Sequence, residues 1–580
     1  MKRGNLSIFL GTLLLLSPMI SLAETYGDFQ YETNASGVTI TKYLGKGTIV
    51  TIPQYFSVTI GTNSPVAFPV TSIGDNVFSN YTSLARVTLP DSVINIGNYA
   101  FYNCYSLTNI VLPDSLASIG NYAFYWCFNL TSITFSNSVN NIGNYAFYRC
   151  LKLTSITFLN SVNNIGNYTF SSCSSLTNIV FPDNLTSMGN NVFDGCSKLT
   201  SIILPNSVTN LGNGVFSYCT SLTNIVLPDS LTSIGNNVFD GCSKLASITL
   251  PDNMTRIGDY AFQDNTNLVS VILGKNTVSI GNGVFSNCTH LVSFTLPDGV
   301  TSIGDKAFYN CTSLINVTFP DSVTSMGSLA FYNCASLTNI VLPKDITSIS
   351  GWTFSSCTNL SGITIPDGVT FIGDHMFSYC TSLTNVTLPD SVASIENFAF
   401  YNCSSLTNVI IGNKVTFIGS YAFQKCTNLT TVTLPDGVTS IGNQAFYNDV
   451  HLANAYFQGD APSSFGSEVF DGTAGGFTIY YPATASGWST PEWKGYPAYP
   501  YDYKLETQPS LVSWKQKVGA ITPTFSELQS GITYQLQISS DLSHWTNMGA
   551  AFTATNNAQV DMESYPMTNA CLFFRLQANP

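Results

Sequence analysis

Cysteine is the most regularly spaced reactive residue in this 580-residue chain, and its thiol could form disulfides, bind a metal or fill a core. Fourteen of the fifteen cysteines follow a step of 23 residues, which is missed only at Asn265 and Asp449. In an exported chain, coils about 5 Å apart would place neighbouring cysteines within disulfide range. All fourteen would nevertheless point into one layer, whereas a disulfide needs two side chains that face each other. We therefore predict buried reduced thiols, with scattered disulfides or a metal site as alternatives.

A second column in the same register holds carboxylates. The position after the slot of the strand-ending proline is Asp at 91, 114, 183, 229, 252, 298, 321, 367, 390 and 436, and Lys at 275 (after Gly274) and 344. Asp at such a position commonly bonds its own turn. A row of cation sites is the alternative, but no repeat supplies the second carboxylate that a calcium site needs. We predict a turn role, with no metal and no cofactor.

Catalytic and nucleic-acid-binding signals are weak. The four histidines, His290, His375, His451 and His544, are scattered and have no recurring acid or serine partner. The sequence has no glycine-rich phosphate loop, nucleophile elbow or zinc-type spacing. With 20 Lys and Arg against 33 Asp and Glu, the chain offers no basic field to a phosphate backbone. We predict a protein that is not an enzyme and does not bind nucleic acid.

The elements that position these residues come from a repeat of 23 residues, for which Ser92 to Asp114 is a good example. Phenylalanine recurs at that step from Phe78 to Phe446, and such a fixed short period is typical of a solenoid. Residues 107–112 predict one short strand, which Pro113 ends. Gly97 marks a tight turn, and residues 98–101 form at most one helical turn. One strand and one return segment per repeat predict a parallel sheet of about 17 repeats, with strands about 4.8 Å apart.

The outward positions of these strands are the candidate binding residues. If Ile110 and Leu112 point inward, Asn109 and Val111 point outward, because strand side chains alternate. The candidates for contact with a partner are Asn109, Val111, Thr134, Thr157, Thr249, Thr295, Thr318, Thr364, Thr387 and Thr433. Strand propensity alone also favours Thr and Val. A long, uncharged face of this kind suits a broad protein or glycan surface better than a small metabolite.

The repeat is similar to the BspA-type leucine-rich repeat, L-x-x-I-x-L-P-x-x-V-x-x-I-G-x-x-A-F-x-x-C. It is matched by Leu222, Ile225, Leu227 and Pro228, with Phe239 and Cys242 closing the turn, and the similarity spans roughly residues 70 to 457. The resemblance implies a right-handed leucine-rich-repeat superhelix on a secreted or surface-exposed protein. It also implies a role like that of adhesins, with the sheet on the concave side.

Changes of composition divide the chain into five parts. Residues 1–23, with Lys2, Arg3 and a short apolar run, predict a secretory signal peptide cleaved near Ala23, and no membrane span in the mature chain. Residues 24–72 predict an N-terminal cap and 73–457 the solenoid. Residues 458–505 predict a C-terminal cap, and 506–580 a small, all-β, sandwich-like module.

Three functions remain open from the sequence. We favour a secreted or surface-associated binding or adhesion protein, which engages a protein or cell-surface partner through the concave sheet. A carbohydrate-binding protein would instead use aromatic rings of the C-terminal region as stacking platforms, namely Trp488, Trp493, Trp514 and Trp545. The third possibility is a passive spacer that presents the C-terminal module.

Overall fold

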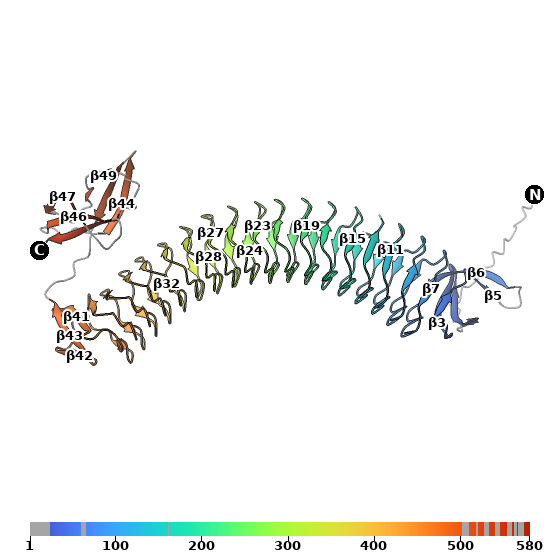
Figure 1. Cartoon of the computed structure of the whole chain (residues 1–580), viewed down its shortest axis with the longest axis horizontal. Coiled ribbons are helices and arrows are strands. Elements are labelled where there is room, and N and C mark those ends of the chain that lie inside the picture. Colours follow the sequence, from blue (N-terminus) through green and yellow to red (C-terminus); the bar gives the residue numbers. More distant parts are fainter. Residues whose placement is uncertain are drawn as a thin grey trace, which may run out of the picture. The chain divides into compact units, whose positions relative to one another are not determined.

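The computed structural model describes residues 24–59, 65–159 and 162–501, and the strands that follow residue 509. The chain forms two compact units, one of Met1–Ala453 with Pro462–Phe477 and one of Asn454–Ala461 with Thr478–Pro580. The first unit is a β-solenoid, seen in Figure 1 as a curved stack of similar coils. The predicted signal peptide, residues 1–23, lies outside the described residues.

Each coil contains two strands, not the single strand that the sequence predicts. The longer strands pair in parallel in short runs, for example with Ile133 opposite Ile156. They are β4 (Ile49–Thr51), β7 (Arg86–Thr88), β9 (Asn109–Val111), β11 (Ser132–Phe135), β13 (Ser155–Phe158), β15 (Asn178–Val180), β17 (Ser201–Ile203), β19 (Asn224–Val226), β21 (Ser247–Thr249), β23 (Ser270–Ile272), β25 (Ser293–Thr295), β27 (Asn316–Thr318), β29 (Asn339–Val341), β31 (Gly362–Thr364), β33 (Asn385–Thr387), β35 (Asn408–Ile410) and β37 (Thr431–Leu434).

The second set consists of two-residue strands just before the slot that glycine fills in most repeats, again parallel and in register, as with Ile119 opposite Ile142. They are β8 (Asn95–Ile96), β10 (Ser118–Ile119), β12 (Asn141–Ile142), β14 (Asn164–Ile165), β16 (Ser187–Met188), β18 (Asn210–Leu211), β20 (Ser233–Ile234), β22 (Arg256–Ile257), β24 (Ser279–Ile280), β26 (Ser302–Ile303), β28 (Ser325–Met326), β30 (Ser348–Ile349), β32 (Phe371–Ile372), β34 (Ser394–Ile395), β36 (Phe417–Ile418), β38 (Ser440–Ile441) and β40 (Ser464–Phe465). Residues 98–101 form turns, within the predicted limit of one helical turn, and the described ranges contain no helix.

The glycine that precedes each turn is needed for close stacking rather than for an unusual backbone angle. A Cβ atom on Gly97 would lie 2.7 Å from the backbone carbon of Gly74 in the preceding coil. The left-handed residues come two and six positions later, at Tyr99 (φ 55°) and Asn103 (φ 59°). The tight turn predicted at Gly97 begins at the next residue, and its left-handed positions are Tyr99 and Asn103. Backbone contact between coils is what excludes a side chain at Gly97.

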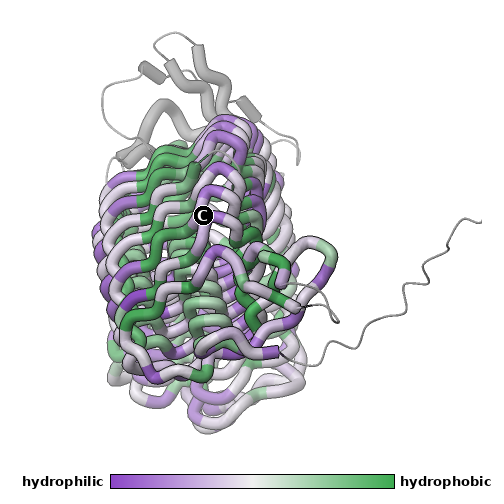
Figure 2. Tube along the Cα trace, turned by 90° about the vertical axis from the view of Figure 1, so that its right-hand side faces the viewer, coloured by the Kyte–Doolittle hydropathy of each residue, from purple (hydrophilic) through white to green (hydrophobic). Residues whose placement is uncertain are grey.

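The core is a set of apolar columns that run the length of the solenoid. In the coil of Phe101, the side chains of Ile96, Phe101, Cys104 and Leu107 are fully buried. The phenylalanine rings from Phe78 to Phe470 form a continuous stack, with centroids 4.9–5.8 Å apart. Figure 2 shows the hydrophobic positions of successive coils in register. Each coil is thus stabilised mainly by its two neighbours.

An atypical segment covers the N-terminal end of the solenoid. Strands β1 (Glu24–Tyr26), β2 (Phe29–Asn34) and β3 (Gly37–Tyr43) form an antiparallel meander, and β3 pairs in parallel with β6 (Val66–Ile73). Strand β5 (Tyr55–Val58) is antiparallel to β6. The ring of Phe56 is fully buried against Tyr26, Phe29 and Tyr31. This arrangement protects the first coil from edge-to-edge association.

The second unit is also built from strands. Strands β39 (Asn454–Phe457), β41 (Thr478–Pro482) and β43 (Tyr496–Tyr501) pair in parallel, and β42 (Glu492–Trp493) is antiparallel to β43. Two antiparallel sheets follow, one of β44 (Ser510–Lys517), β45 (Ala520–Ser526), β48 (Val560–Asp561) and β49 (Tyr565–Pro566), the other of β46 (Thr533–Ser539), β47 (Thr546–Thr553) and β50 (Phe573–Asn579). A search of the described residues for a helix able to cross a membrane found none.

Candidate functional site

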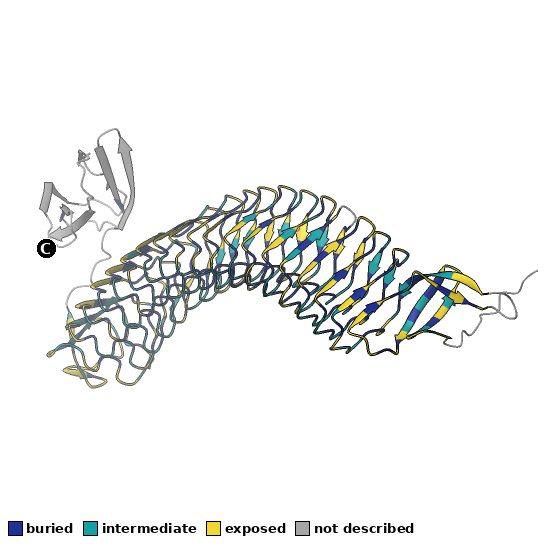
Figure 3. Cartoon of the chain, turned by 45° about the vertical axis from the view of Figure 1, so that its right-hand side comes forward, coloured by how far each residue is buried: buried dark blue, intermediate teal, exposed yellow. Residues whose placement is uncertain are grey.

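The candidate site is the outer side of the longer strands, which we call the strand face. Along most of these strands the first and third residues are exposed and the second is buried, as for Asn109, Ile110 and Val111. Figure 3 shows this alternation along the strands. It follows from the two-residue period of a β-strand, whose middle side chain enters the core.

The structure places all ten predicted contact residues on the strand face. Two of them, Thr157 and Thr433, are half-buried. The other eight are exposed: Asn109, Val111, Thr134, Thr249, Thr295, Thr318, Thr364 and Thr387. They lie in register with equivalents one coil away, for example Thr295 opposite Thr318. The predicted residues therefore form columns along the solenoid and do not converge on one point.

Exposed aliphatic side chains interrupt the hydroxyl and amide columns of the strand face. Val111 is 72% exposed, Val341 80% and Ile203 70%. From β7 to β35, Arg86 is the only charged residue at an outward position of these described strands. A face that joins accessible methyl groups to neutral polar groups can be dehydrated at low cost, since no charge must leave water.

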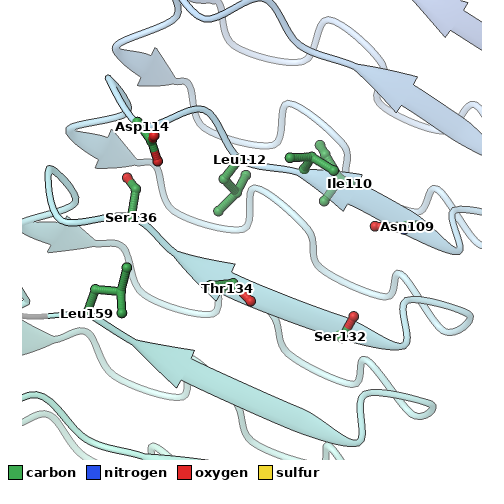
Figure 4. A pocket seen from close by; sticks show the side chains of 9 residues that line it. Asn109, Ile110, Leu112, Asp114, Ser132, Thr134, Ser136 and Leu159 are labelled. Carbon is green, nitrogen blue, oxygen red and sulfur yellow. The ribbon is translucent and has the colours of Figure 1, made fainter.

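A shallow hollow of about 250 Å³ lies on this face across the coils of β9, β11 and β13. It is lined by Asn109, Ile110, Val111, Leu112, Asp114, Ser132, Thr134, Ser136 and Leu159. Figure 4 shows Asp114, Ser136 and Leu159 near the ends of their strands, with Asn109, Ser132 and Thr134 along the strands themselves. The hollow is smaller than most small-molecule pockets, and it suits one inserted side chain of a partner.

The sequence reasoning found Asn109, Val111 and Thr134 but missed the rest of the hollow. Ser136 and Leu159 occupy the slot that Pro113 fills in its own repeat. β11 and β13 are each one residue longer than β9 and end at Phe135 and Phe158. The replacement of proline by Ser136 and Leu159 in adjacent repeats is the sequence signal that could have located the hollow.

The cysteine column is a layer of hydrogen-bond donors. All fourteen described cysteines are free and buried. Each Sγ donates to the backbone carbonyl of the phenylalanine 26 residues earlier, as Cys104 does to Phe78, over 3.1–3.4 Å. Burial raises the pKa of Cys104 to about 12, and that of Cys127 well above its ordinary value. The prediction of buried reduced thiols is confirmed, and protonated thiols of this kind are unreactive.

Asn265 and Asp449 show what the cysteine slot requires. The Nδ2 of Asn265 donates to the carbonyl oxygen of Phe239 over 2.8 Å, as a thiol would. Asp449 accepts the backbone N–H of Cys426 at Oδ1 over 2.8 Å, while its buried Oδ2 has no partner. Burial raises the pKa of Asp449 well above the usual range of an aspartate. The cysteine slot therefore favours a hydrogen-bond donor, and an ionised carboxylate has no hydrogen to donate.

Three aspartates of the acidic column bond to the next coil, whereas the sequence predicted that each would bond within its own turn. Asp252 Oδ2 lies 2.6 Å from Lys275 Nζ, and Asp321 Oδ2 lies 3.2 Å from Lys344 Nζ, both pairs well exposed. Asp390 Oδ1 accepts the backbone N–H of Asn413 over 2.7 Å. Among the described residues there is no group of three or more His, Cys, Asp or Glu placed to hold a metal.

The described histidines make contacts within the fold. Ring nitrogens of His290 and His451 bond to backbone carbonyls, and His375 stacks between Trp352 and Phe398. His544 lies outside the described residues.

Two of the four tryptophans proposed as glycan platforms pack against other rings of the second unit, with Trp493 buried and Trp488 half-buried. Trp493 is 5% exposed and donates to the carbonyl of Gly487, and Trp488 stacks on Tyr481 with ring centroids 4.8 Å apart. A buried ring cannot stack on a sugar, so Trp493 is excluded as a platform. Trp545 and the side chain of Trp514 lie outside the described residues.

The parallel strands, the phenylalanine stack and the cysteine layer define a leucine-rich-repeat solenoid. The chain belongs to the BspA-type leucine-rich-repeat family, whose model matches residues 55–177, 163–292, 278–403 and 352–475. No curated protein shows significant similarity to it.

Solved bacterial structures are similar to the chain. A leucine-rich repeat protein from Bacteroides ovatus is 23% identical, covering 83% of this chain and 100% of that one, with a TM-score of 0.46. A leucine-rich cell surface protein from Faecalibacterium prausnitzii is 32% identical, covering 67% and 94%, with a TM-score of 0.37. The pneumococcal vaccine antigen PcpA is 16% identical, covering 80% and 94%, with a TM-score of 0.30.

Proposed function

We propose that this BspA-type repeat protein is secreted or surface-associated and binds a protein or cell-surface partner through its strand face. The observation that carries the proposal is the long, uncharged strand face with exposed Val111, Ile203 and Val341. The N-terminal residues 1–23 have the composition of a signal peptide, and the relative from Faecalibacterium prausnitzii is described as a cell surface protein. Both support a location outside the cell and a role in adhesion.

The dimensions of the strand face favour a macromolecular partner. Sixteen strands from β7 to β37, about 4.8 Å apart, extend over roughly 75 Å. Protein interfaces depend on a few well-packed anchors within a broad area of weaker contacts. The exposed aliphatic side chains and the hollow beside Thr134 are candidates for such anchors. We do not favour a glycan as the main partner, because Trp493 is buried and Trp488 is covered on one face by Tyr481.

Introducing three cations on the strand face should strongly weaken partner binding. In the variant Thr295→Arg, Thr318→Arg, Thr364→Arg, an uncharged column would carry three charges that a partner must dehydrate. We expect at least about tenfold weaker capture of the partner. Residues 24–580 would serve as bait for surface proteins from the organism and its surroundings, with captured proteins compared by mass spectrometry.

The control adds three charges to the turn side of the coils, as Ser172→Arg, Ser356→Arg, Asn402→Arg, at positions with a left-handed backbone. That column already contains Arg149 and Lys425, both with a left-handed backbone, so the fold accepts cations there. The control should capture the same partner as the wild type. Unchanged capture by the strand-face variant would contradict the proposal and favour the spacer role.

A further inference from the structure

A second surface stands out on the turn side of the first coils, where tyrosines recur at the repeat step. Tyr99, Tyr122, Tyr145 and Tyr168 form a stack with centroids 4.7–4.9 Å apart and rings within 5° of parallel. A second stack, Tyr102, Tyr125 and Tyr148, runs beside it at 4.9–5.1 Å. We call the two stacks the tyrosine ladder. The sequence reasoning did not use this column, although its period is visible in the printed sequence.

The ladder presents ring edges and hydroxyl groups to solvent. Its rings are partly exposed, up to 37% for Tyr99, while each ring inside a stack has its faces covered by its neighbours. None of the seven hydroxyls bonds to another described group of the chain. Burial raises the pKa of Tyr125 and Tyr145, so these phenols remain donors. The edge of an aromatic ring is the positive end of its quadrupole, so both exposed features favour an electronegative partner atom.

The charged side chains near the ladder also favour an electronegative partner. The chain as a whole has a formal net charge of −13, but residues 92–181 contain only Asp114, Arg149 and Lys152 as charged residues. The guanidinium carbon of Arg149 lies 5.7 Å from the ring centroid of Tyr148. Arg149 and Lys152 are exposed and make no ion pair within the described chain. Asp114 lines the hollow of the strand face, and Asp75 lies in the coil before Tyr99, where its Oδ1 accepts the backbone N–H of Asn98 over 2.7 Å.

We propose that the tyrosine ladder is a second interaction surface, which binds an acidic segment of a partner protein. Carboxylates of the segment would accept hydrogen bonds from the tyrosine hydroxyls and pair with Arg149. Its apolar side chains would cover the ring edges. Tyrosine and arginine are enriched at the anchoring points of protein interfaces. A neutral glycan fits less well, because sugars stack on open ring faces and the faces in the ladder are covered.

Substitutions that other repeats already contain can test the ladder without disturbing the fold. Asn191 and Asn237 occupy the slot of Tyr122 and Tyr145, with φ of 54° and 57°. Ser172 and Ser356 occupy the slot of Arg149, with φ of 61° and 63°. The test variants are therefore Tyr122→Asn with Tyr145→Asn, and Arg149→Ser. The matched control is Tyr260→Asn, because Tyr260 fills the same slot between Asn237 and Gly283, outside any stack.

The measurement is fluorescence anisotropy of labelled peptides with residues 24–580. One peptide alternates Glu with Leu, its counterpart alternates Lys with Leu, and a galacturonate oligomer tests acidic glycans. We expect the Glu peptide alone to bind, with affinity that falls as salt rises. The double tyrosine variant and Arg149→Ser should each bind about tenfold more weakly, and Tyr260→Asn like the wild type.

Three outcomes would overturn the proposal. One is no binding of the Glu peptide, or equal binding of the Lys peptide. Another is wild-type affinity in both test variants. The third is binding of the galacturonate oligomer without the peptide, which would assign the ladder to an acidic glycan. Because the ladder and the strand face are on different sides of the coil, none of these results bears on the function proposed for the strand face.

Discussion

Replacement of Phe239 by Ala is expected to lower the free energy of unfolding by about 3–5 kcal/mol. The ring is fully buried and stacked between Phe216 at 5.8 Å and Phe262 at 5.4 Å. Its removal leaves a cavity that two neighbouring coils line together. Because coils are stabilised mainly by their neighbours, the loss should also divide the array and split the unfolding transition in two.

Urea unfolding followed by circular dichroism would measure this effect. Tyr260→Asn is the control, since Tyr260 lies one coil away, is 37% exposed and is replaced by the residue that other repeats have in its slot. The control should stay within about 0.5 kcal/mol of the wild type. A loss below about 1 kcal/mol for Phe239→Ala would mean that the phenylalanine stack is not the core of the solenoid.

Replacement of Asp449 by Asn is expected to stabilise the protein at neutral pH by about 1–3 kcal/mol. The pKa of Asp449 is raised in the folded chain, so folding favours its protonated form. Below the ordinary aspartate pKa the carboxyl of Asp449 is protonated in both the folded and the unfolded chain, and its burial then carries no cost from ionisation. The wild type loses stability as the pH rises through the raised value. Asn has no such titration, so the advantage of Asp449→Asn should shrink as the pH is lowered.

The reciprocal variant, Asn265→Asp, gives an internal comparison in the same slot. It removes the Nδ2 donor that bonds to Phe239, and it buries a carboxylate instead. We expect a loss of about 1–3 kcal/mol at neutral pH, which becomes smaller in acid. Thermal unfolding of both variants at neutral and acidic pH would measure these changes. Equal stability of Asp449→Asn and wild type at neutral pH would contradict the account of the cysteine slot.

The period of the repeat was sufficient to predict most of the solenoid. Because every repeat places apolar residues at the same positions, Ile110 and Leu112 could be assigned to the core and Asn109 to the surface. The thiol layer followed from the same register. The second strand of each coil was missed because two residues such as Asn95–Ile96 are too short to show a period.

Contacts between coils could not be predicted from the sequence. The close approach of Gly97 to Gly74 depends on how coils stack, and so does the bond from Cys104 to Phe78. The left-handed backbone at Tyr99 was hidden because it falls on tyrosine, a residue that rarely adopts it. The hollow beside Ser136 required two strand ends in neighbouring coils, although the missing prolines marked the place.

The central claim, that a partner covers the strand face, can be tested with the chemistry of the cysteine layer. The fourteen described thiols are buried, so a new surface cysteine would react alone once Cys571 is replaced by Ser. Thr318→Cys would report on the strand face, and Lys306→Cys on the turn side of the same region. The rate of maleimide labelling is measured with and without the captured partner. The account predicts that the partner slows labelling at Thr318→Cys and leaves Lys306→Cys unchanged; protection of Lys306→Cys alone would contradict it.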